Sequence, residues 1–287
     1  MSDSDKRRTG LLLGLGLRRR HLGLPYIRSL IRPFTKMGVV RYQFVSGAEA
    51  RTNFVVKVGA SQFQYALDVG DPIGSILYWR SWKEWEFGEV TLFSKWMQGA
   101  RRILDIGAYT GFYALLGAAS GSEVIAFEPN PEAFRRLQRN IRLNHFESKC
   151  VLWNLAAGSN AEEIPFHVHE DDPTCSSAVR PSATQIIVQS ARVDTVVPLD
   201  HRTDLVKMDV EGFEDQALCG MEGILRDSHP KIVFECFRKR TAPIVEGLLK
   251  DNGYKLNWIA PDGSAEPIER IAVEKYGHGW HNFAAHI

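Results

Sequence analysis

One stretch, residues 101–144, constrains the fold more than any other part of this 287-residue chain. It begins with a short apolar run at 103–106, continues through Gly107 and Gly111, and then enters a second apolar run at 112–119. A short apolar run bounded by glycine is typical of a buried strand, and the longer run after it predicts a helix. The stretch therefore begins as strand, turn and helix, with a ligand crevice expected at the turn.

A second strand and helix follow in the same stretch. The apolar run 124–127 ends at Glu128, and Asn130 and Pro131 then supply an N-cap and a proline for the first helical position. Leu137 and Ile141 recur at helical spacing after them. The pattern predicts a βαβα unit in which the carboxyl end of the second strand lies beside the glycine turn.

The acids and glycines of this unit favour one nucleoside ligand over another. Glu128, at the end of the second strand, can accept both hydroxyls of a ribose, in NAD and in S-adenosylmethionine alike. A pyrophosphate needs G-x-G-x-x-G, but Tyr109 takes the place of the middle glycine. Asp105 would repel a phosphate and can hold an ammonium group or a water molecule. S-adenosylmethionine is therefore favoured, and an NAD-dependent oxidoreductase is the weaker alternative.

Several short motifs, more specific together than singly, resemble the FkbM-type S-adenosylmethionine-dependent methyltransferases over about residues 86–254. Tyr109 stands where that family usually has asparagine. The motifs are D-I-G-A-Y-T-G at 105–111, E-P-N-P at 128–131, L-x-x-N-I-x-x-N at 137–144, N-L-A-A-G at 154–158, K-M-D-V-E-G-F-E at 207–214 and P-K-I-V-F-E at 230–235.

The resemblance implies an α/β protein with the class I methyltransferase Rossmann-like fold, a mostly parallel seven-stranded sheet with helices on both faces. It implies S-adenosylmethionine as methyl donor and a hydroxyl of a sugar, glycan or polyketide-like secondary metabolite as acceptor. It also places a family glutamate upstream of the turn, at Glu86 or its neighbour Glu84. The expected cofactor-binding residues are Glu86, Asp105, Gly107, Ala108, Tyr109, Gly111, Phe112, Glu128, Pro129, Asn130, Leu155, Ala156 and Asp209.

A second informative stretch, residues 204–214, carries the candidates for catalysis. Its apolar residues predict a buried strand, and Asp209 falls near the carboxyl end of that strand, on the edge expected for Asp105 and Glu128. Methyl transfer to an alcohol requires close alignment and removal of a proton. Asp209 is the first candidate for the base, Glu211 and Glu235 come after it, and Lys207 could orient an acid or donate to an acceptor oxygen.

Metal sites are not favoured by the sequence. The acid cluster could hold Mg²⁺ bridging two substrate hydroxyls, but Mg²⁺ usually takes only one or two protein carboxylates. Four widely spaced cysteines without a C-x-x-C pair argue against a zinc site or a disulfide framework and fit a reducing compartment.

The chain is expected to comprise a basic N-terminal arm at 1–38, a β/α extension at 39–98 and the methyltransferase domain at 99–287. The apolar run 11–17 of the arm is far shorter than the roughly 20 residues that span a bilayer. The arm could contact an anionic membrane or a partner, or form a solvated leader, which is the favoured interpretation. A net charge of +1 gives no reason to expect a nucleic-acid partner. We expect a cytoplasmic enzyme, with peripheral membrane contact as an alternative.

Other segments give further expectations. Residues 150–156 should form the next parallel strand, 161–168 and 185–191 a hairpin around a long loop, and 213–225 one helix. His167 and His169 alternate in this hairpin region, where they could act as a base or half of a metal site, although a solvated edge is favoured. A non-catalytic nucleoside-binding scaffold remains the alternative from another functional class.

Overall fold

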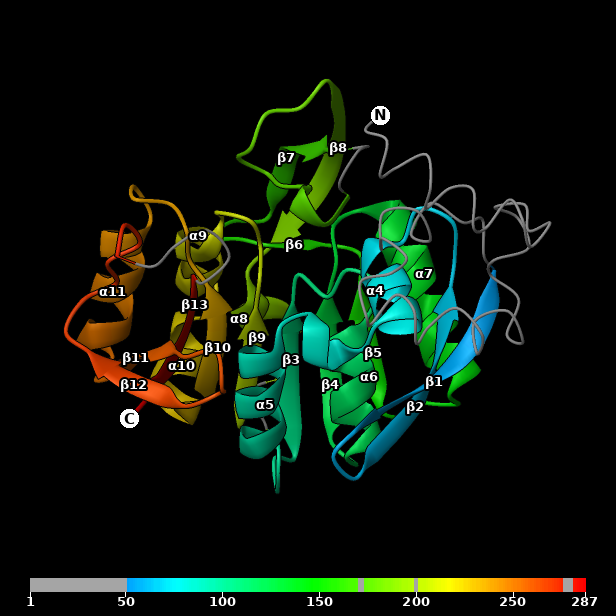
Figure 1. Cartoon of the computed structure of the whole chain (residues 1–287). Coiled ribbons are helices and arrows are strands. Elements are labelled where there is room, and N and C mark those ends of the chain that lie inside the picture. The colour runs from blue at the N-terminus through cyan, green and yellow to red at the C-terminus, as the bar shows by residue number, and fades with distance from the viewer. Residues whose placement is uncertain (1–50, 170–172, 199–200, 276–280) are drawn as a thin grey trace, which may run out of the picture. The chain divides into compact units, whose positions relative to one another are not determined.

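The computed structural model describes residues 51–169, 173–198, 201–275 and 281–287 (Figure 1). The described residues divide into two compact units. The smaller unit contains residues 51–56 and 64–86, and the larger unit contains residues 57–63 and the described residues from 87 to 287. The predicted basic arm lies outside the described residues, as does the beginning of the predicted extension.

The smaller unit contains most of β1 (Thr52–Val58) and β2 (Ser61–Leu67), which form a two-stranded sheet, followed by α4 (Pro72–Trp79) and the short η2 (Trp82–Glu84). Asp71 caps α4, because its Oδ1 accepts a hydrogen bond from Gly74 N at 2.9 Å. The Tyr65 hydroxyl donates to the other oxygen of Asp71 at 3.0 Å.

The larger unit is built on an eight-stranded sheet in the order β12-β11-β13-β10-β9-β3-β4-β5. Strands β5, β4, β3, β9 and β10 pair in parallel, whereas β13 pairs antiparallel with both β10 and β11. The mostly parallel class I fold is confirmed, but the predicted count of seven strands is wrong by one, because β12 adds an antiparallel edge to β11. The strands are β3 (Arg102–Ile106), β4 (Glu123–Phe127), β5 (Cys150–Trp153), β9 (Leu205–Met208), β10 (Lys231–Glu235), β11 (Lys255–Ile259), β12 (Ala265–Ile268) and β13 (Asn282–His286).

Helices cover both faces of this sheet. On β3, Leu104 and Ile106 belong to a core cluster with residues of the helices α8 to α11, whereas Ile103 faces Gly117 of α6 on the other side. This alternation follows from the two-residue period of a strand. The helices are α5 (Phe87–Trp96), α6 (Phe112–Ala119), α7 (Pro131–Leu143), α8 (Val193–Val196), α9 (Glu214–Cys219), α10 (Glu222–Ser228) and α11 (Ala242–Asp251).

The order of the strands reverses beside β3, whose neighbours are β4 on one side and β9 on the other. The chain moves outward from β3 through β4 and β5, and later returns to its other side with β9. Ligands of open α/β sheets bind at such a switch point, beyond the carboxyl ends of the strands. The fold therefore directs attention to the residues after β3, β4 and β9.

The predicted strand 150–156 is interrupted after Trp153. The Asn154 side chain donates to the carbonyl oxygens of Glu128, at 2.8 Å, and Pro129, at 3.0 Å. The next two residues form β6 (Ala156–Ala157), which joins β7 (Glu162–Val168) and β8 (Thr184–Ala191) in a separate three-stranded sheet. The predicted hairpin of β7 and β8 is confirmed, including its antiparallel pairing.

The prediction of one helix over 213–225 is wrong, because α9 ends before Gly220 and α10 begins after Met221. A side chain at Gly220 would place its Cβ 2.1 Å from the carbonyl oxygen of Gly158, so the chain is held against another segment there. Asp194 then caps α10 from outside, since its carboxylate accepts from Gly223 N at 2.9 Å and Ile224 N at 3.0 Å. These tertiary contacts override the continuous helical pattern.

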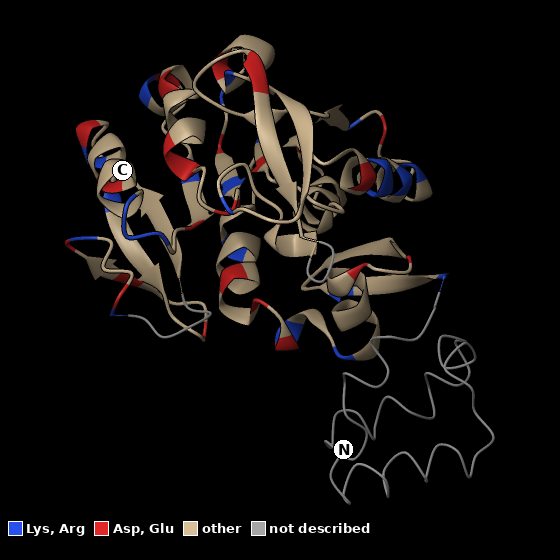
Figure 2. Ribbon diagram, turned by 90° about the horizontal axis from the view of Figure 1, so that it is seen from above, with Lys and Arg blue, Asp and Glu red and all other residues tan. Residues whose placement is uncertain are grey.

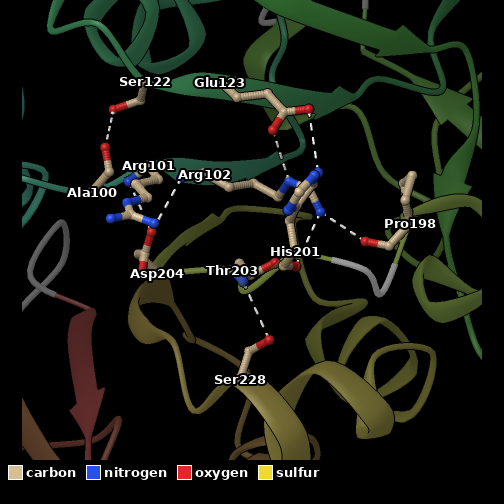
Figure 3. A network of polar contacts seen from close by, with 10 residues as sticks. All are labelled: Ala100, Arg101, Arg102, Ser122, Glu123, Pro198, His201, Thr203, Asp204 and Ser228. Carbon is tan, nitrogen blue, oxygen red and sulfur yellow. Dashed lines mark hydrogen bonds and ion pairs between the residues drawn. The ribbon is translucent and has the colours of Figure 1, made fainter.

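The amino ends of the central strands are joined by a polar network (Figure 3). The side chain of Arg102 is 3% exposed, pairs with Glu123 at 3.0 Å and donates to the carbonyl oxygens of Pro198 and His201. Asp204 accepts from the backbone N–H groups of Arg101 and Arg102. This network connects the starts of β3, β4 and β9, so the charges at this edge have a structural purpose.

Lysine and arginine are interspersed with aspartate and glutamate over the described helices and strands (Figure 2). None of the helices in the described ranges combines the length and the apolar character needed to cross a membrane.

The ends of β3 and β9 approach each other closely at Gly107. Asp209 N donates to Ile106 O at 2.9 Å, and a Cβ on Gly107 would lie only 1.7 Å from Asp209 O. Gly107 also has φ = +83°, a conformation that other residues rarely adopt. Only glycine fits at this position, so the turn and the residue after β9 pack backbone to backbone.

We predict that Gly107→Ala lowers the free energy of unfolding by at least about 3 kcal/mol, because it adds steric overlap to a left-handed backbone. Gly99→Ala is the matched control, since Gly99 has φ = +79° and a Cβ added there would meet no other segment within 4 Å. The control should cost only about 1–2 kcal/mol in urea unfolding. If the two variants lose the same free energy of unfolding, β3 and β9 do not approach each other as closely as the distance of 1.7 Å from the added Cβ to Asp209 O implies.

Candidate active site

The glycine turn after β3 uses its backbone N–H groups within the protein. Gly107 N and Ala108 N donate to Phe127 O at 3.0 and 2.9 Å, and Gly111 N donates to Ala108 O at 2.8 Å. Tyr109 N donates to Glu128 Oε2 at 2.8 Å. A pyrophosphate would need such donors to be available. The turn is therefore unsuited to a dinucleotide, which weighs against the NAD alternative.

Tyr109 has φ = +48°, in the left-handed region. Asparagine adopts this region more easily than tyrosine, because its short side chain makes less steric conflict with the backbone. The family residue at this position is thus suited to the backbone conformation that this chain retains. Tyr109 therefore adopts a backbone conformation that asparagine would adopt with less steric cost.

Glu128 joins the two halves of the βαβα unit. Its Oε2 accepts from Tyr109 N and its Oε1 accepts from Asn130 N, each at 2.8 Å. Burial raises the pKa of Glu128 to about 7, and the two backbone N–H groups oppose that shift by favouring the carboxylate. Each oxygen of a carboxylate has a second lone pair. Glu128 is consequently fixed in position and still able to accept a ribose hydroxyl.

Asp105 lies on β3, 1% exposed, and its Oδ2 has no hydrogen-bond partner within the described chain. Burial raises its pKa to about 7, although the nearby Lys207 acts in the opposite direction. A buried polar atom without a partner costs about 1–3 kcal/mol, so such atoms usually bind a ligand or an ordered water. Asp105 is therefore a candidate for binding the ligand.

Lys207 lies between two carboxylates. Its Nζ is 2.9 Å from Glu89 Oε1 and 3.2 Å from Asp209 Oδ2, and the side chains of Lys207 and Glu89 are each 1% exposed. Asp105 is its register partner on β3, and its Nζ lies 5.0 Å from the ring centre of Tyr113. The lysine is thus enclosed by protein groups and holds one oxygen of Asp209 in place.

Sequence reasoning missed Glu89, which lies in α5. Burial raises its pKa, and the pairing with Lys207 opposes this effect. The available signal was an acid three residues after Glu86 in an otherwise apolar helix segment. Glu86 itself belongs to the smaller unit, so its predicted place near the cofactor stays a prediction.

Three carboxylates converge beyond the ends of β9 and β10. One oxygen from each of Asp209, Glu211 and Glu235 lies within 4.8 Å of the others, and all three residues are half-buried. Burial raises the pKa of Glu235 well above its ordinary value, and the negative charges of Asp209 and Glu211 add to the effect. The structure therefore brings together the predicted catalytic acids in what we call the acid cluster, consisting of these three residues.

The other predicted cofactor residues have these positions in the fold. Asn130 caps α7 by accepting from Glu132 N at 3.0 Å. The ring of Phe112 packs against Phe63, with the ring centres 5.8 Å apart, and the residue is 2% exposed, so its side chain belongs to the core. Pro129 and Leu155 are half-buried and Ala156 is buried in β6.

The loop between β7 and β8 is connected to the acid cluster. The hydroxyl of Ser177, a buried residue, donates to Glu211 O at 2.8 Å. Glu211 has φ = +54°, so this bond supports a backbone conformation that favours glycine. His167 Nδ1 accepts from Ser182 N at 3.4 Å, and His169 Nε2 lies 3.3 Å from Arg180 O. These contacts support the interpretation of the two histidines as part of the hairpin edge.

A groove of about 670 Å³ lies elsewhere, along α11. Its lining includes Lys250, which pairs with Glu246 at 2.7 Å, and Arg270, which pairs with Glu274 at 3.7 Å. The groove lacks the acids at the ends of β3, β4 and β9. The sheet edge is therefore the better candidate for chemistry.

We predict strong coupling between Lys207 and Glu89. Lys207→Met should lower the free energy of unfolding by about 3–5 kcal/mol, because it leaves Glu89 buried without its cation. Lys207→Met combined with Glu89→Gln should cost clearly less than the sum of the two single changes. The exposed pair Lys250 and Glu246, given the same substitutions, should couple by less than about 1 kcal/mol. Additivity at both pairs in urea unfolding would contradict the buried arrangement.

Glu214 gives a pH-dependent prediction. It is 0% exposed, its Oε1 accepts from Gly212 N at 2.7 Å, and burial raises its pKa from 4.5 to about 7. The native state therefore binds a proton more strongly than the unfolded state does, and Glu214 makes stability fall as pH rises from about 4.5 to about 7.

Glu214→Gln keeps the acceptor oxygen and removes the titration. Between pH 4.5 and pH 8, the free energy of unfolding of this variant, measured in urea, should rise by roughly 2–3 kcal/mol relative to that of the parent chain. Glu222→Gln, at an exposed position of α10, should show the parental pH dependence. Identical curves for all three proteins would mean that Glu214 is ionised without cost.

Comparison with known proteins places the chain in a family. The model of the methyltransferase FkbM domain matches residues 105–256, more than half of the chain. The hexuronic acid methyltransferase AglP of Haloferax volcanii is 27% identical over 133 residues, which are 45% of this chain and 53% of that protein. The chain thus spans about half the length of this curated relative.

Solved methyltransferase structures also resemble the chain. Methyltransferase FkbM from Methylobacillus flagellatus is 20% identical, with a TM-score of 0.44, over 66% of this chain and 44% of that one. A SAM-dependent methyltransferase from Agrobacterium tumefaciens is 12% identical, also with a TM-score of 0.44, over 82% of this chain and 70% of that one. On the match of the family model, this chain belongs to the FkbM methyltransferase domain family.

Proposed function

We propose that the chain is an S-adenosylmethionine-dependent O-methyltransferase that acts on a hydroxyl of a sugar, glycan or polyketide-like secondary metabolite. The observation that carries the proposal is the set of acids at the switch point of the sheet. Asp105 is the last but one residue of β3, and Glu128 and Asp209 directly follow β4 and β9. Membership of the FkbM methyltransferase family supports the type of reaction.

The residues present suit this cofactor. Glu128 would bind the ribose hydroxyls through its remaining lone pairs, and Asp105 Oδ2, which has no partner in the described chain, would accept from the ammonium group or a bound water. Asp209 would attract the positive sulfonium. The acids at the ends of β3, β4 and β9 outnumber the one buried lysine among them, Lys207, which favours a cationic ligand. The N–H groups of the turn already donate to protein oxygens, which disfavours an anionic ligand.

S-adenosylmethionine, when bound, supplies a methyl group activated by a sulfonium. The task of the protein is chiefly to align the acceptor, which can contribute up to roughly 7–11 kcal/mol to catalysis. We propose Asp209 as the base. Lys207 holds its Oδ2 at 3.2 Å, and its side chain is 31% exposed, so Oδ1 can face the hydroxyl and take its proton.

The other acids support this role. Burial and the negative charges of Asp209 and Glu211 raise the pKa of Glu235, so Glu235 holds a proton more strongly than an exposed glutamate does. Lys207 is enclosed by Glu89 and Asp209, which supports orienting an acid as its role and leaves direct donation to the acceptor as the weaker alternative.

The charge of the acid cluster supports a neutral nucleophile. The relative AglP is a hexuronic acid methyltransferase, and a hexuronic acid offers both hydroxyl and carboxylate oxygens. The negative charge of the cluster would repel an attacking carboxylate, whereas a hydroxyl can give its proton to an ionised acid of the cluster. A sugar hydroxyl is therefore the favoured acceptor.

Two arrangements compete with this proposal. Mg²⁺ could bind the acid cluster and bridge two substrate hydroxyls, and the spacing of the three oxygens would permit it. A non-catalytic scaffold would bind the nucleoside without turnover. We favour the enzyme, because Asp105, Glu128 and Asp209 are all present near the carboxyl ends of neighbouring strands.

We further propose the division of the chain predicted from the sequence, with the methyltransferase domain at 99–287 after an extension at 39–98. The cytoplasm is the proposed compartment. Peripheral membrane contact through the basic arm stays a prediction, as does the absence of a nucleic-acid partner.

The test is calorimetry followed by turnover. The chain should bind S-adenosylmethionine and S-adenosylhomocysteine but not NADH, and it should transfer labelled methyl groups to a hydroxylated sugar. Asp209→Asn should lower the rate by about 100-fold or more, because it removes the base. Asp215→Asn, in α9 outside the cluster, is the control and should remain active.

Other results would support the competitors. Binding of NADH alone would favour the oxidoreductase, and binding of the two adenosyl compounds without transfer to any hydroxylated acceptor would favour the scaffold. A rate abolished by EDTA and restored by Mg²⁺ would support a metal in the acid cluster.

A further inference from the structure

One arginine at the rim of the acid cluster has no ionic partner among the described residues. Arg238 follows Glu235 by three residues, in the connection between β10 and α11. The residue is half-buried, and its Nε is enclosed without a hydrogen-bond partner in the described chain. Nη1 and Nη2 are not enclosed and likewise have no partner in the described chain, so they can donate to an incoming group.

Packing holds the arginine beside the cluster. A Cβ on Gly212 would lie 2.2 Å from Arg238 Nε and 3.0 Å from its Cζ, so the side chain lies against the backbone directly after Glu211. The ring centre of Phe237 is 5.8 Å from the guanidinium carbon. Gly212, with φ = +100°, leaves the space that the arginine occupies. Within the described part of the chain, the cation is thus held by packing and not by an ion pair.

The chemistry of guanidinium indicates the ligand. Its planar set of five donors matches the oxygens of a carboxylate or phosphate and can bind them in pairs. We propose that Arg238 binds an anionic group of the acceptor, a carboxylate or a phosphate, while the acid cluster receives the hydroxyl that is methylated. This inference rests on the proposed function and adds the class of acceptor to it.

The opposite charges of Arg238 and the acid cluster would orient the acceptor. Asp209, Glu211 and Glu235 repel an anion, and Arg238 attracts it, so an acidic sugar would enter with its anionic group turned towards Arg238. The hydroxyl presented to Asp209 would then be selected by its distance from that group. Arg238 would determine both the choice of acceptor and the position of methylation.

The experiment uses the full chain saturated with S-adenosylhomocysteine and measures binding of three sugars by calorimetry. Glucuronate carries a carboxylate, glucose 6-phosphate carries a phosphate, and glucose carries neither. At least one anionic sugar should bind about tenfold more tightly than glucose or better. Preference for glucuronate would identify a carboxylate as the anionic group, and preference for glucose 6-phosphate a phosphate.

Arg238→Gln should weaken binding of the preferred anionic sugar by roughly 10- to 100-fold and leave that of glucose unchanged. The matched control is Arg240→Gln, two residues later and exposed, which should keep the parental preference. Binding of S-adenosylhomocysteine by each variant verifies that the site is folded.

Three results would overturn the inference: equal binding of glucose and the anionic sugars, a preference that persists in Arg238→Gln, or no detectable binding of any of the three. Failure of the parent chain to bind S-adenosylhomocysteine would instead refute the proposed function. The two failures are therefore distinguishable.

Discussion

The structure of the site depends on the close approach of β9 to the turn after β3. Gly107 permits it, because any side chain would collide with the carbonyl oxygen of Asp209. The same approach places Lys207 beside Asp105 in register and within reach of Glu89. Backbone geometry and buried charge are thus parts of one arrangement. Separating the ends of the two strands would break the hydrogen bond from Asp209 N to Ile106 O.

Charged side chains are arranged differently at the amino ends and at the carboxyl ends of the parallel strands. At the amino ends, Arg102 is paired with Glu123 and with carbonyl oxygens, and Asp204 accepts backbone N–H groups (Figure 3). At the carboxyl ends, Asp105 keeps an oxygen without a partner in the described chain, and acids outnumber cations. Charged groups that all have hydrogen-bond or ionic partners stabilise a fold. A buried polar group without a partner is instead typical of a site that binds a ligand. The carboxyl edge is the one that carries function.

Local signals in the sequence predicted the strand, turn and helix around Gly107, and the structure has that helix at Phe112–Ala119. They failed where distant contacts decide. The strand after Cys150 stops early because Asn154 bonds to Glu128 and Pro129, and the helix after Phe213 breaks because Gly220 packs on Gly158. Glu89 could not be recognised, since its importance comes from Lys207, more than one hundred residues away. Likewise, only the packing of Arg238 on Gly212 reveals that arginine as a candidate.

The most direct measurement is a crystal structure of the chain with S-adenosylhomocysteine. We expect the ribose hydroxyls to lie within hydrogen-bond distance of Glu128, the amino acid moiety near Asp105, and the sulfur facing Asp209 and the acid cluster. A nucleoside bound at another edge of the sheet, or side chains filling the space between these acids, would contradict the assignment of the site.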